Sequence, residues 1–101
     1  MDARELAEVC VKALSEDRYV YLSHRGTLRD VYPYEIVEGR LYCWCSLHSD
    51  RTVEGMYLAN IDAAAVSNRE IGMLFPFESE FSPEAEAMRK EAEKKEKTGS
   101  K

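Results

Sequence analysis

The chain has 101 residues, the length of one domain, and 45% of them are apolar while 33% are charged. This balance excludes a chain that is disordered throughout, and no apolar run approaches the roughly 20 residues of a membrane-spanning helix. The formal net charge of −5 argues against binding of duplex nucleic acid through the overall charge of the protein. The first five residues do not resemble a signal peptide, and the three cysteines form no disulfide framework. We therefore expect a cytoplasmic protein with reduced thiols.

Residues 1–17 predict an amphipathic helix. Asp2 is a capping residue, Glu5 stands at capping-box spacing from it, and we expect the helix to end near Glu16 or Asp17. The apolar residues of this segment recur at helical spacing and form one stripe that must be buried: Leu6, Val9, Cys10, Ala13 and Leu14.

From residue 18 the hydrophobic pattern changes to a period of two, which predicts strands. We expect strands at 19–24, 28–37, 40–47, 52–58 and 62–67, separated by turn signals such as Arg25-Gly26 and Glu38-Gly39. Pro33 lies in the middle of the second strand and predicts a sheet edge or a bend there. Short strands at this spacing indicate a small barrel or sandwich.

The C-terminal part predicts a second helix. The hydrophobic segment 71–81 contains Pro76 and is not typical of a central strand, and Ser82-Pro83-Glu84 is a strong helix start. Five of the six bases after residue 77 are lysines, which is typical of a solvated helix over 84–97. We expect residues 98–101 to be disordered. The chain thus divides into a helix (1–17), a β domain (18–82) and a charged helix with a tail (83–101).

The third expected strand carries the most informative pattern. Alternation places Leu41, Cys43, Cys45 and Leu47 on the core side, and Arg40, Tyr42, Trp44 and Ser46 on the outer side. Together with Tyr19 and Tyr21 of the first strand, and with Tyr32 or Tyr34 of the second, the outer side would be an aromatic face that carries arginines. Such a face can stack bases and clamp phosphates. Alternatively, the N-terminal helix or a second copy of the chain covers these aromatic rings.

Other chemistry is weakly indicated. Cys43 and Cys45 with His24 and His48 invite a zinc site, but structural zinc pairs usually have two to four intervening residues on a turn. A cysteine nucleophile would lack an orienting acid, and residues 48–50 have a turn composition. The sequence has no glycine-rich phosphate loop. We therefore expect no metal, no cofactor and no enzymatic activity.

Several short motifs follow one another between residues 18 and 82. The strand Val20–His24 precedes Arg29–Pro33, which has the pattern Arg-x-Val-x-Pro, and Gly39 then marks a turn. Leu41–Cys43 has a central tyrosine, Met56–Ile61 follows in the next strand, and Phe75-Pro76 with Phe81-Ser82 closes the series. In this order the motifs resemble the WYL domain, a prokaryotic ligand-binding module.

The resemblance implies an Sm-like, SH3-type barrel of five strands that is preceded by a helix. WYL domains usually stand behind a DNA-reading domain or beside defence systems, and they are thought to sense nucleotides or nucleic-acid ends. Arg29 and Tyr42 match polar positions of the family. His24 stands where the family has a tyrosine, and Glu54 and Asn60 stand where it has arginines, which removes two positive charges.

Our leading hypothesis is a mainly β, stand-alone regulatory module that binds a nucleotide, a single-stranded nucleic acid or another anionic ligand. In this hypothesis Arg29 pairs with phosphate, Tyr42 and Trp44 stack on rings, and His24 and Arg25 line the rim. The expected partners are a second copy of the chain and a DNA-binding or defence-system protein, and no membrane. The alternative is a protein-interaction or oligomerisation module, in which the aromatic face is an interface and the charged helix docks a partner.

Overall fold

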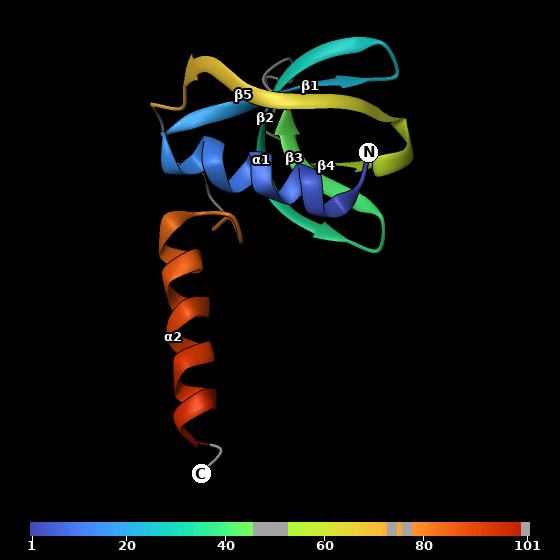
Figure 1. Cartoon of the computed structure of the whole chain (residues 1–101). Coiled ribbons are helices and arrows are strands. Elements are labelled where there is room, and N and C mark those ends of the chain that lie inside the picture. Colours follow the sequence, from blue (N-terminus) through green and yellow to red (C-terminus); the bar gives the residue numbers. More distant parts are fainter. Residues whose placement is uncertain (46–52, 73–74, 76–77, 100–101) are drawn as a thin grey trace.

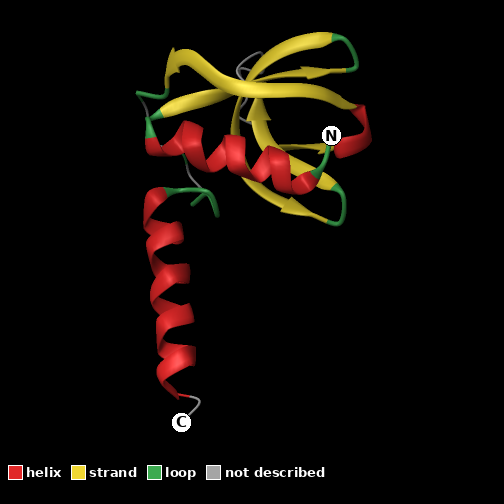
Figure 2. Cartoon of the chain, in the orientation of Figure 1, coloured by secondary structure: helices red, strands yellow, loops and turns green. Residues whose placement is uncertain are grey.

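The computed structural model describes residues 1–45, 53–72, 75 and 78–99. Within them the protein is mainly β, with helix α1 (Ala3–Ser15) before the strands and helix α2 (Pro83–Gly99) after them. The strands are β1 (Arg18–His24), β2 (Thr27–Val37), β3 (Arg40–Cys45), β4 (Val53–Tyr57) and β5 (Ile61–Glu70), and a short 3-10 helix, η1 (Leu58–Asn60), joins the last two. Figures 1 and 2 show α1 lying beside the sheet and α2 extending away from it.

The five strands form one open antiparallel sheet in the order β4-β3-β2-β1-β5. The predicted class, a mainly β domain with a helix at each end, is therefore confirmed. Strand β5 continues to Glu70, which is further than the alternating pattern predicted. The expected end of the third strand at 46–47, the turn at 48–51 and the start of the fourth strand at residue 52 lie outside the described residues.

Helix α1 forms where its capping and its apolar stripe predict it. The Asp2 side chain accepts a hydrogen bond from the Arg4 N–H at 3.1 Å, and Glu16 is the C-cap. The buried face of α1 packs against β1 and β5 and consists of Leu6, Cys10, Ala13 and Leu14. Each fully buried aliphatic side chain contributes about 1.5–3 kcal/mol, so this face holds the helix on the sheet.

The side of β3 that was predicted to face the core does lie in the interior of the domain. Leu41, Cys43 and Cys45 are fully buried. They belong to one cluster with the buried face of α1 and with Val20, Leu22, Val31, Met56 and Ile61.

Strand β2 bends where Pro33 interrupts it, and the segment after β5 is tied to this bend. The register between β2 and β3 shifts just after Pro33, which frees backbone groups from the ladder. The Ser79 hydroxyl donates to the Pro33 carbonyl at 2.7 Å, and the Glu80 N–H donates to the Tyr34 carbonyl at 2.9 Å. The Ile36 N–H donates to the Glu80 carboxylate at 3.1 Å. These bonds fix the path of residues 78–81 across the sheet.

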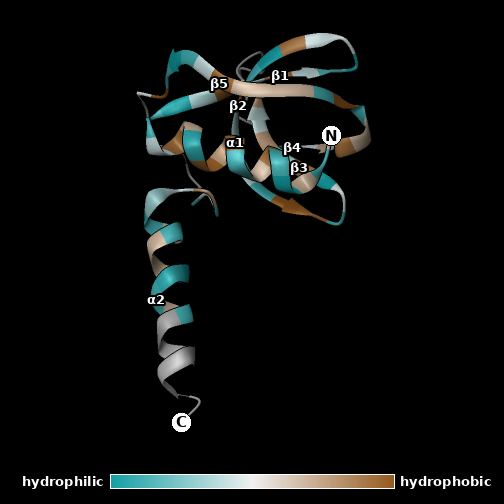
Figure 3. Cartoon of the chain, viewed as in Figure 1, coloured by the Kyte–Doolittle hydropathy of each residue, from teal (hydrophilic) through white to brown (hydrophobic). Residues whose placement is uncertain are grey.

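Helix α2 begins at the predicted start signal. The Ser82 hydroxyl accepts a hydrogen bond from the Ala85 N–H at 3.2 Å. The described part of α2 carries mostly hydrophilic residues, and Met88 is exposed (Figure 3). Helix α2 continues to Gly99, two residues beyond the end expected from the sequence, and residues 100–101 lie outside the described residues. Among the helices that the structure describes, none combines the length and the apolar character needed to cross a membrane.

Candidate functional site

The five residues that the sequence singles out lie in two separate places. His24, Arg25 and Arg29 belong to the β1–β2 hairpin, whereas Tyr42 and Trp44 belong to the outer side of β3. Val31 pairs with Cys45, and Arg29 lies two residues before Val31 on the same side of β2. The Arg29 Nη1 atom is accordingly 3.9 Å from the Cys45 sulfur. The hypothesis places Arg29, Tyr42 and Trp44 around one ligand, but alternation along the strands puts Arg29 on the side of Cys45, opposite to Tyr42 and Trp44.

The charge of Arg29 is engaged within the protein. Its Nη1 atom donates to both carboxylate oxygens of Glu54, at 3.3 and 3.2 Å. The Arg29 side chain is 19% exposed and that of Glu54 is 33% exposed, so solvent screens the pair only in part. The buried Arg29 Nε has no hydrogen-bond partner among the described residues. In this arrangement Arg29 acts first as a structural ion-pair partner, and a role in phosphate binding stays a prediction.

His24 and Arg25 lie beside this ion pair. Burial lowers the pKa of His24 first, the nearby Arg29 and Arg25 guanidinium groups lower it further, and the carboxylates of Glu54 and Asp62 oppose the shift. Arg25 is exposed in the hairpin turn, with φ at 51°. The roles of His24 and Arg25 at the rim of a ligand site stay predictions.

Trp44 lies on the predicted side of β3, but its ring is covered. Its side chain is 7% exposed, and the indole ring centroid lies 5.3 Å from that of Phe75 and 6.3 Å from that of Tyr19. The expectation that Trp44 offers a free stacking surface is therefore wrong. Phe75, in the segment after β5, and Tyr19 of β1 contribute to this cover. Of the two tyrosines expected on this face, Tyr19 is buried and Tyr21 is exposed.

The open part of the outer face is formed by Arg40, Tyr42 and Tyr57. The Arg40 guanidinium carbon lies 4.4 Å from the centroid of the Tyr57 ring, and Arg40 donates a hydrogen bond to the Tyr57 hydroxyl. A hydrogen bond with Tyr42 is the largest cause that raises the pKa of Arg40, and the interaction with Tyr57 adds to it. Tyr57 is 50% exposed and Tyr42 is partly exposed. We call these three residues the Arg40 face.

Gly55 shapes the Arg40 face from the neighbouring strand. It pairs with Tyr42, and a Cβ atom at this position would lie 3.1 Å from the Tyr42 ring. The absence of a side chain therefore lets the ring lie across β4. Alternation places Arg40 beside Tyr42, but the contribution of Tyr57 depends on the β3–β4 register, which the sequence does not reveal.

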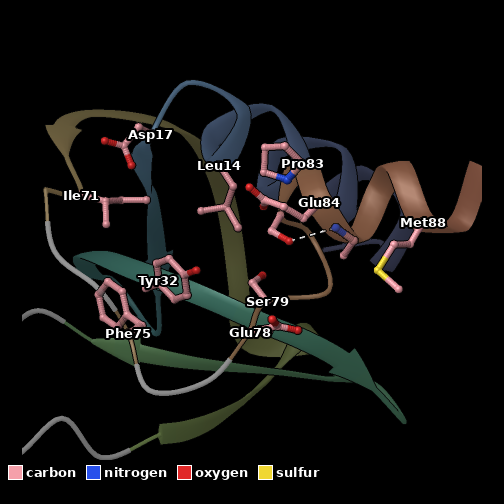
Figure 4. A pocket seen from close by; sticks show the side chains of 12 residues that line it. Leu14, Asp17, Tyr32, Ile71, Phe75, Glu78, Ser79, Pro83, Glu84 and Met88 are labelled. Carbon is pink, nitrogen blue, oxygen red and sulfur yellow. Dashed lines mark hydrogen bonds between the residues drawn. The ribbon is translucent and has the colours of Figure 1, made fainter.

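A pocket of about 430 Å³ lies between the end of α1, β2, the segment after β5 and the start of α2 (Figure 4). The Tyr32 ring stacks on Phe75 in its wall, with centroids 3.9 Å apart and an interplanar angle of 12°. Burial raises the pKa of Tyr32, and the negative charges of Glu84 and Asp17 raise it further. Local patterns in the sequence do not predict this pocket, because its walls come from parts of the chain that are far apart: the end of α1, β2 and the C-terminal part from Ile71 to Met88.

The three cysteines lie in the interior of the domain. Cys10, Cys43 and Cys45 are buried and free. Burial raises the pKa of Cys10 to about 12 and also raises that of Cys43, so these two thiols stay protonated at neutral pH. Among the described residues, no group of three or more His, Cys, Asp or Glu side chains could hold a metal ion. His48, a candidate zinc ligand from the sequence, lies outside the described residues.

The chain was compared with protein-family models, curated proteins and solved structures, and none of them matches it.

Proposed function

We propose that the protein is a non-enzymatic regulatory binding module that recognises an anionic ligand, such as a nucleotide or a short single-stranded nucleic acid, on the Arg40 face. The observation that carries this proposal is the guanidinium of the partly exposed Arg40, which lies on the ring of Tyr57 and has no carboxylate partner among the described residues. Arg40 thus takes the phosphate-binding role that the sequence suggested for Arg29.

The fold is compatible with the WYL-like part of the proposal. The strand order makes β4 and β5 the two outer strands, and η1 connects them directly. The Leu58 N–H donates to the Gly39 carbonyl at 2.9 Å, and the Arg25 N–H donates to the Asn60 carbonyl at 3.0 Å. These bonds tie η1 to the β1–β2 turn and to the β2–β3 turn, which favours an Sm-like or SH3-type barrel. A regulatory role, exerted through a DNA-binding or defence-system partner, rests on the WYL resemblance alone.

The chemistry of the Arg40 face sets the expected affinity. Stacking of one base on an aromatic ring contributes about 1–3 kcal/mol, and a hydrogen bond to a charged group contributes about 1.5–3 kcal/mol. One stacked ring and one guanidinium therefore give weak to moderate binding once ordering costs are subtracted. Tyr42 and Tyr57 supply the rings, and Arg40 supplies the charge. Tighter binding requires a longer ligand or a second copy of the chain.

The test is fluorescence anisotropy with a labelled oligothymidylate, in competition with unlabelled mononucleotides. We expect saturable binding that weakens about tenfold or more in Arg40→Ala, because a charge-assisted contact is lost. Arg4→Ala is the matched control, since Arg4 is an exposed arginine on α1 and its loss changes the net charge equally. Absence of saturable binding, or equal weakening in both variants, would overturn the proposal.

The rival function, an assembly module, is favoured by one observation on the same face. Val37 is 41% exposed and pairs with Arg40, which in turn pairs with Tyr57. Exposed apolar and aromatic residues beside an arginine are typical of protein interfaces. Light scattering after size exclusion, over a range of protein concentrations, separates the two functions. A ligand-independent dimer that Tyr57→Ala dissociates would favour assembly.

A further inference from the structure

The pocket of Figure 4 has no lining residue in common with the Arg40 face, and its chemistry is different. Its wall is largely apolar. Leu14 comes from α1, Ile71 and Phe75 come from the segment after β5, and Met88 comes from α2. Tyr32 completes this wall through its stacking on Phe75. A ligand with an aliphatic body can therefore remove apolar surface from water here.

The polar groups of the pocket carry one sign of charge. Asp17, Glu78 and Glu84 line it, and none of its described lining residues is basic. Asp17 and Glu84 lie close enough to Tyr32 for both to raise the pKa of its hydroxyl, so their fields overlap at the pocket wall. Figure 4 shows Asp17 and Glu84 on different sides of the cavity.

The helix ends around the pocket do not cancel this negative potential. Leu14 belongs to the last turn of α1, where the carbonyl groups give a partial negative charge. The first turn of α2 has a partial positive charge, but Ser82 caps it and Glu84 lies within it. The two helix ends thus contribute partial charges of opposite sign, and the carboxylates that line the pocket decide in favour of a cation.

We infer that this pocket binds an organic cation with an aliphatic body, that is, an alkylammonium or alkylguanidinium group. The aliphatic part lies against Leu14, Ile71 and the Tyr32–Phe75 stack, and the charged head faces the carboxylates of Asp17 and Glu84. A free polyamine and a lysine or arginine side chain of a partner share this chemistry. The inference does not depend on the function proposed for the Arg40 face.

The single tryptophan provides the readout. The ring centroids of Trp44 and Phe75 are 5.3 Å apart, and Phe75 lines the pocket. Occupation of the pocket should therefore change the fluorescence emission of Trp44. Hexylammonium, hexanol and hexanoate are titrated into the full chain, because they share one aliphatic body and differ in charge. We expect a saturable change with hexylammonium and much weaker changes with the other two. Equal responses to all three would overturn the inference, because the site would then select only for apolar surface.

Two variants test whether the carboxylates of Glu84 and Asp17 attract the ammonium group of the ligand. Glu84→Gln and Asp17→Asn should each weaken hexylammonium binding by about two- to fivefold, the range for partly exposed ion pairs. Asparagine accepts the positive φ of 56° at position 17, so the backbone is retained. Glu91→Gln is the matched control, because Glu91 is exposed on α2 and does not line the pocket. Equal weakening in the control would overturn the inference, since only the overall charge would then matter.

A last comparison identifies the source of the cation. Spermidine and a short lysine-containing peptide amide are titrated in parallel, and the Glu84→Gln variant must weaken whichever binds more tightly. Tighter binding of spermidine assigns the pocket to a free polyamine, and tighter binding of the peptide assigns it to a partner protein. If neither probe binds, the inference fails.

Discussion

Arg29 and Arg40 are the same residue type in two different environments. Glu54 neutralises Arg29 between strands, and the Arg29 side chain is mostly buried. Arg40 lies over the ring of Tyr57 and forms hydrogen bonds with the side chains of Tyr57 and Tyr42. A guanidinium paired with a carboxylate has to break that pair before it binds phosphate, whereas one held by tyrosines does not. At the scale of single residues, the partner of each arginine decides its role.

The first residue-scale prediction concerns Arg29→Ala. This variant leaves the Glu54 carboxylate partly buried without its guanidinium partner, so we expect the free energy of unfolding in urea to fall by about 1–3 kcal/mol. It should also raise the pKa of His24 in an NMR titration, because Arg29 lowers that pKa in the folded protein. Arg25→Ala is the control, with an expected change within about 0.5 kcal/mol because Arg25 is exposed. An unchanged stability of Arg29→Ala would contradict a structural role.

The sequence was sufficient to predict on which side of the sheet a side chain lies, but not whether that side chain is buried or exposed. Alternation correctly placed Cys43 and Cys45 in the core and Trp44 on the opposite side of β3. Trp44 is covered in part by Phe75, which lies between β5 and the residues that are hydrogen-bonded to the middle of β2. No local pattern encodes that contact, since it needs the folded path of two distant segments.

At the scale of elements, the sequence was sufficient to predict features that depend only on residues close together in the chain, such as helix caps. The Asp2 and Ser82 caps and the bend at Pro33 are interactions between near neighbours or intrinsic properties of a residue, and the structure confirms each of them. The length of β5 was underestimated, because its last residues are held by pairing with β1 rather than by their own pattern: Arg18 pairs with Glu70. Strand pairing is a tertiary effect that overrides local propensity.

The element-scale prediction compares two truncated chains. One loses only an exposed part of α2, and the other also loses the residues that anchor the C-terminal segment on β2. A chain that ends at Lys90 removes residues of α2 whose described side chains, Glu91 to Glu93, are exposed. We expect its free energy of unfolding in urea to stay within about 0.5 kcal/mol of that of the full chain. A chain that ends at Glu78 also loses the buried Phe81, which is 3% exposed, and should lose at least about 3 kcal/mol. Equal stability of the two truncated chains would contradict the anchoring of residues 79–81 on β2.

At the scale of the whole molecule, the net charge acts differently on the two proposed sites. The formal charge of −5 repels an anion that approaches the Arg40 face, while the local guanidinium attracts it. For a cation at the pocket of Asp17 and Glu84, the overall and the local fields both attract. The two ligands should therefore respond differently to added salt, even though each site holds charged groups.

The whole-molecule prediction uses this difference. Raising the ionic strength from about 10 mM to about 150 mM shortens the Debye length from about 30 Å to about 8 Å. We expect the affinity for hexylammonium to fall severalfold, because screening removes both attractive contributions. The affinity for a mononucleotide should fall less, because screening removes a repulsion together with an attraction. Calorimetric titrations at the two salt concentrations measure both responses, with Glu84→Gln and Arg40→Ala to assign each signal to its site. If the two ligands lose affinity by the same factor, the overall charge does not distinguish the sites, and their assigned signs of charge are wrong.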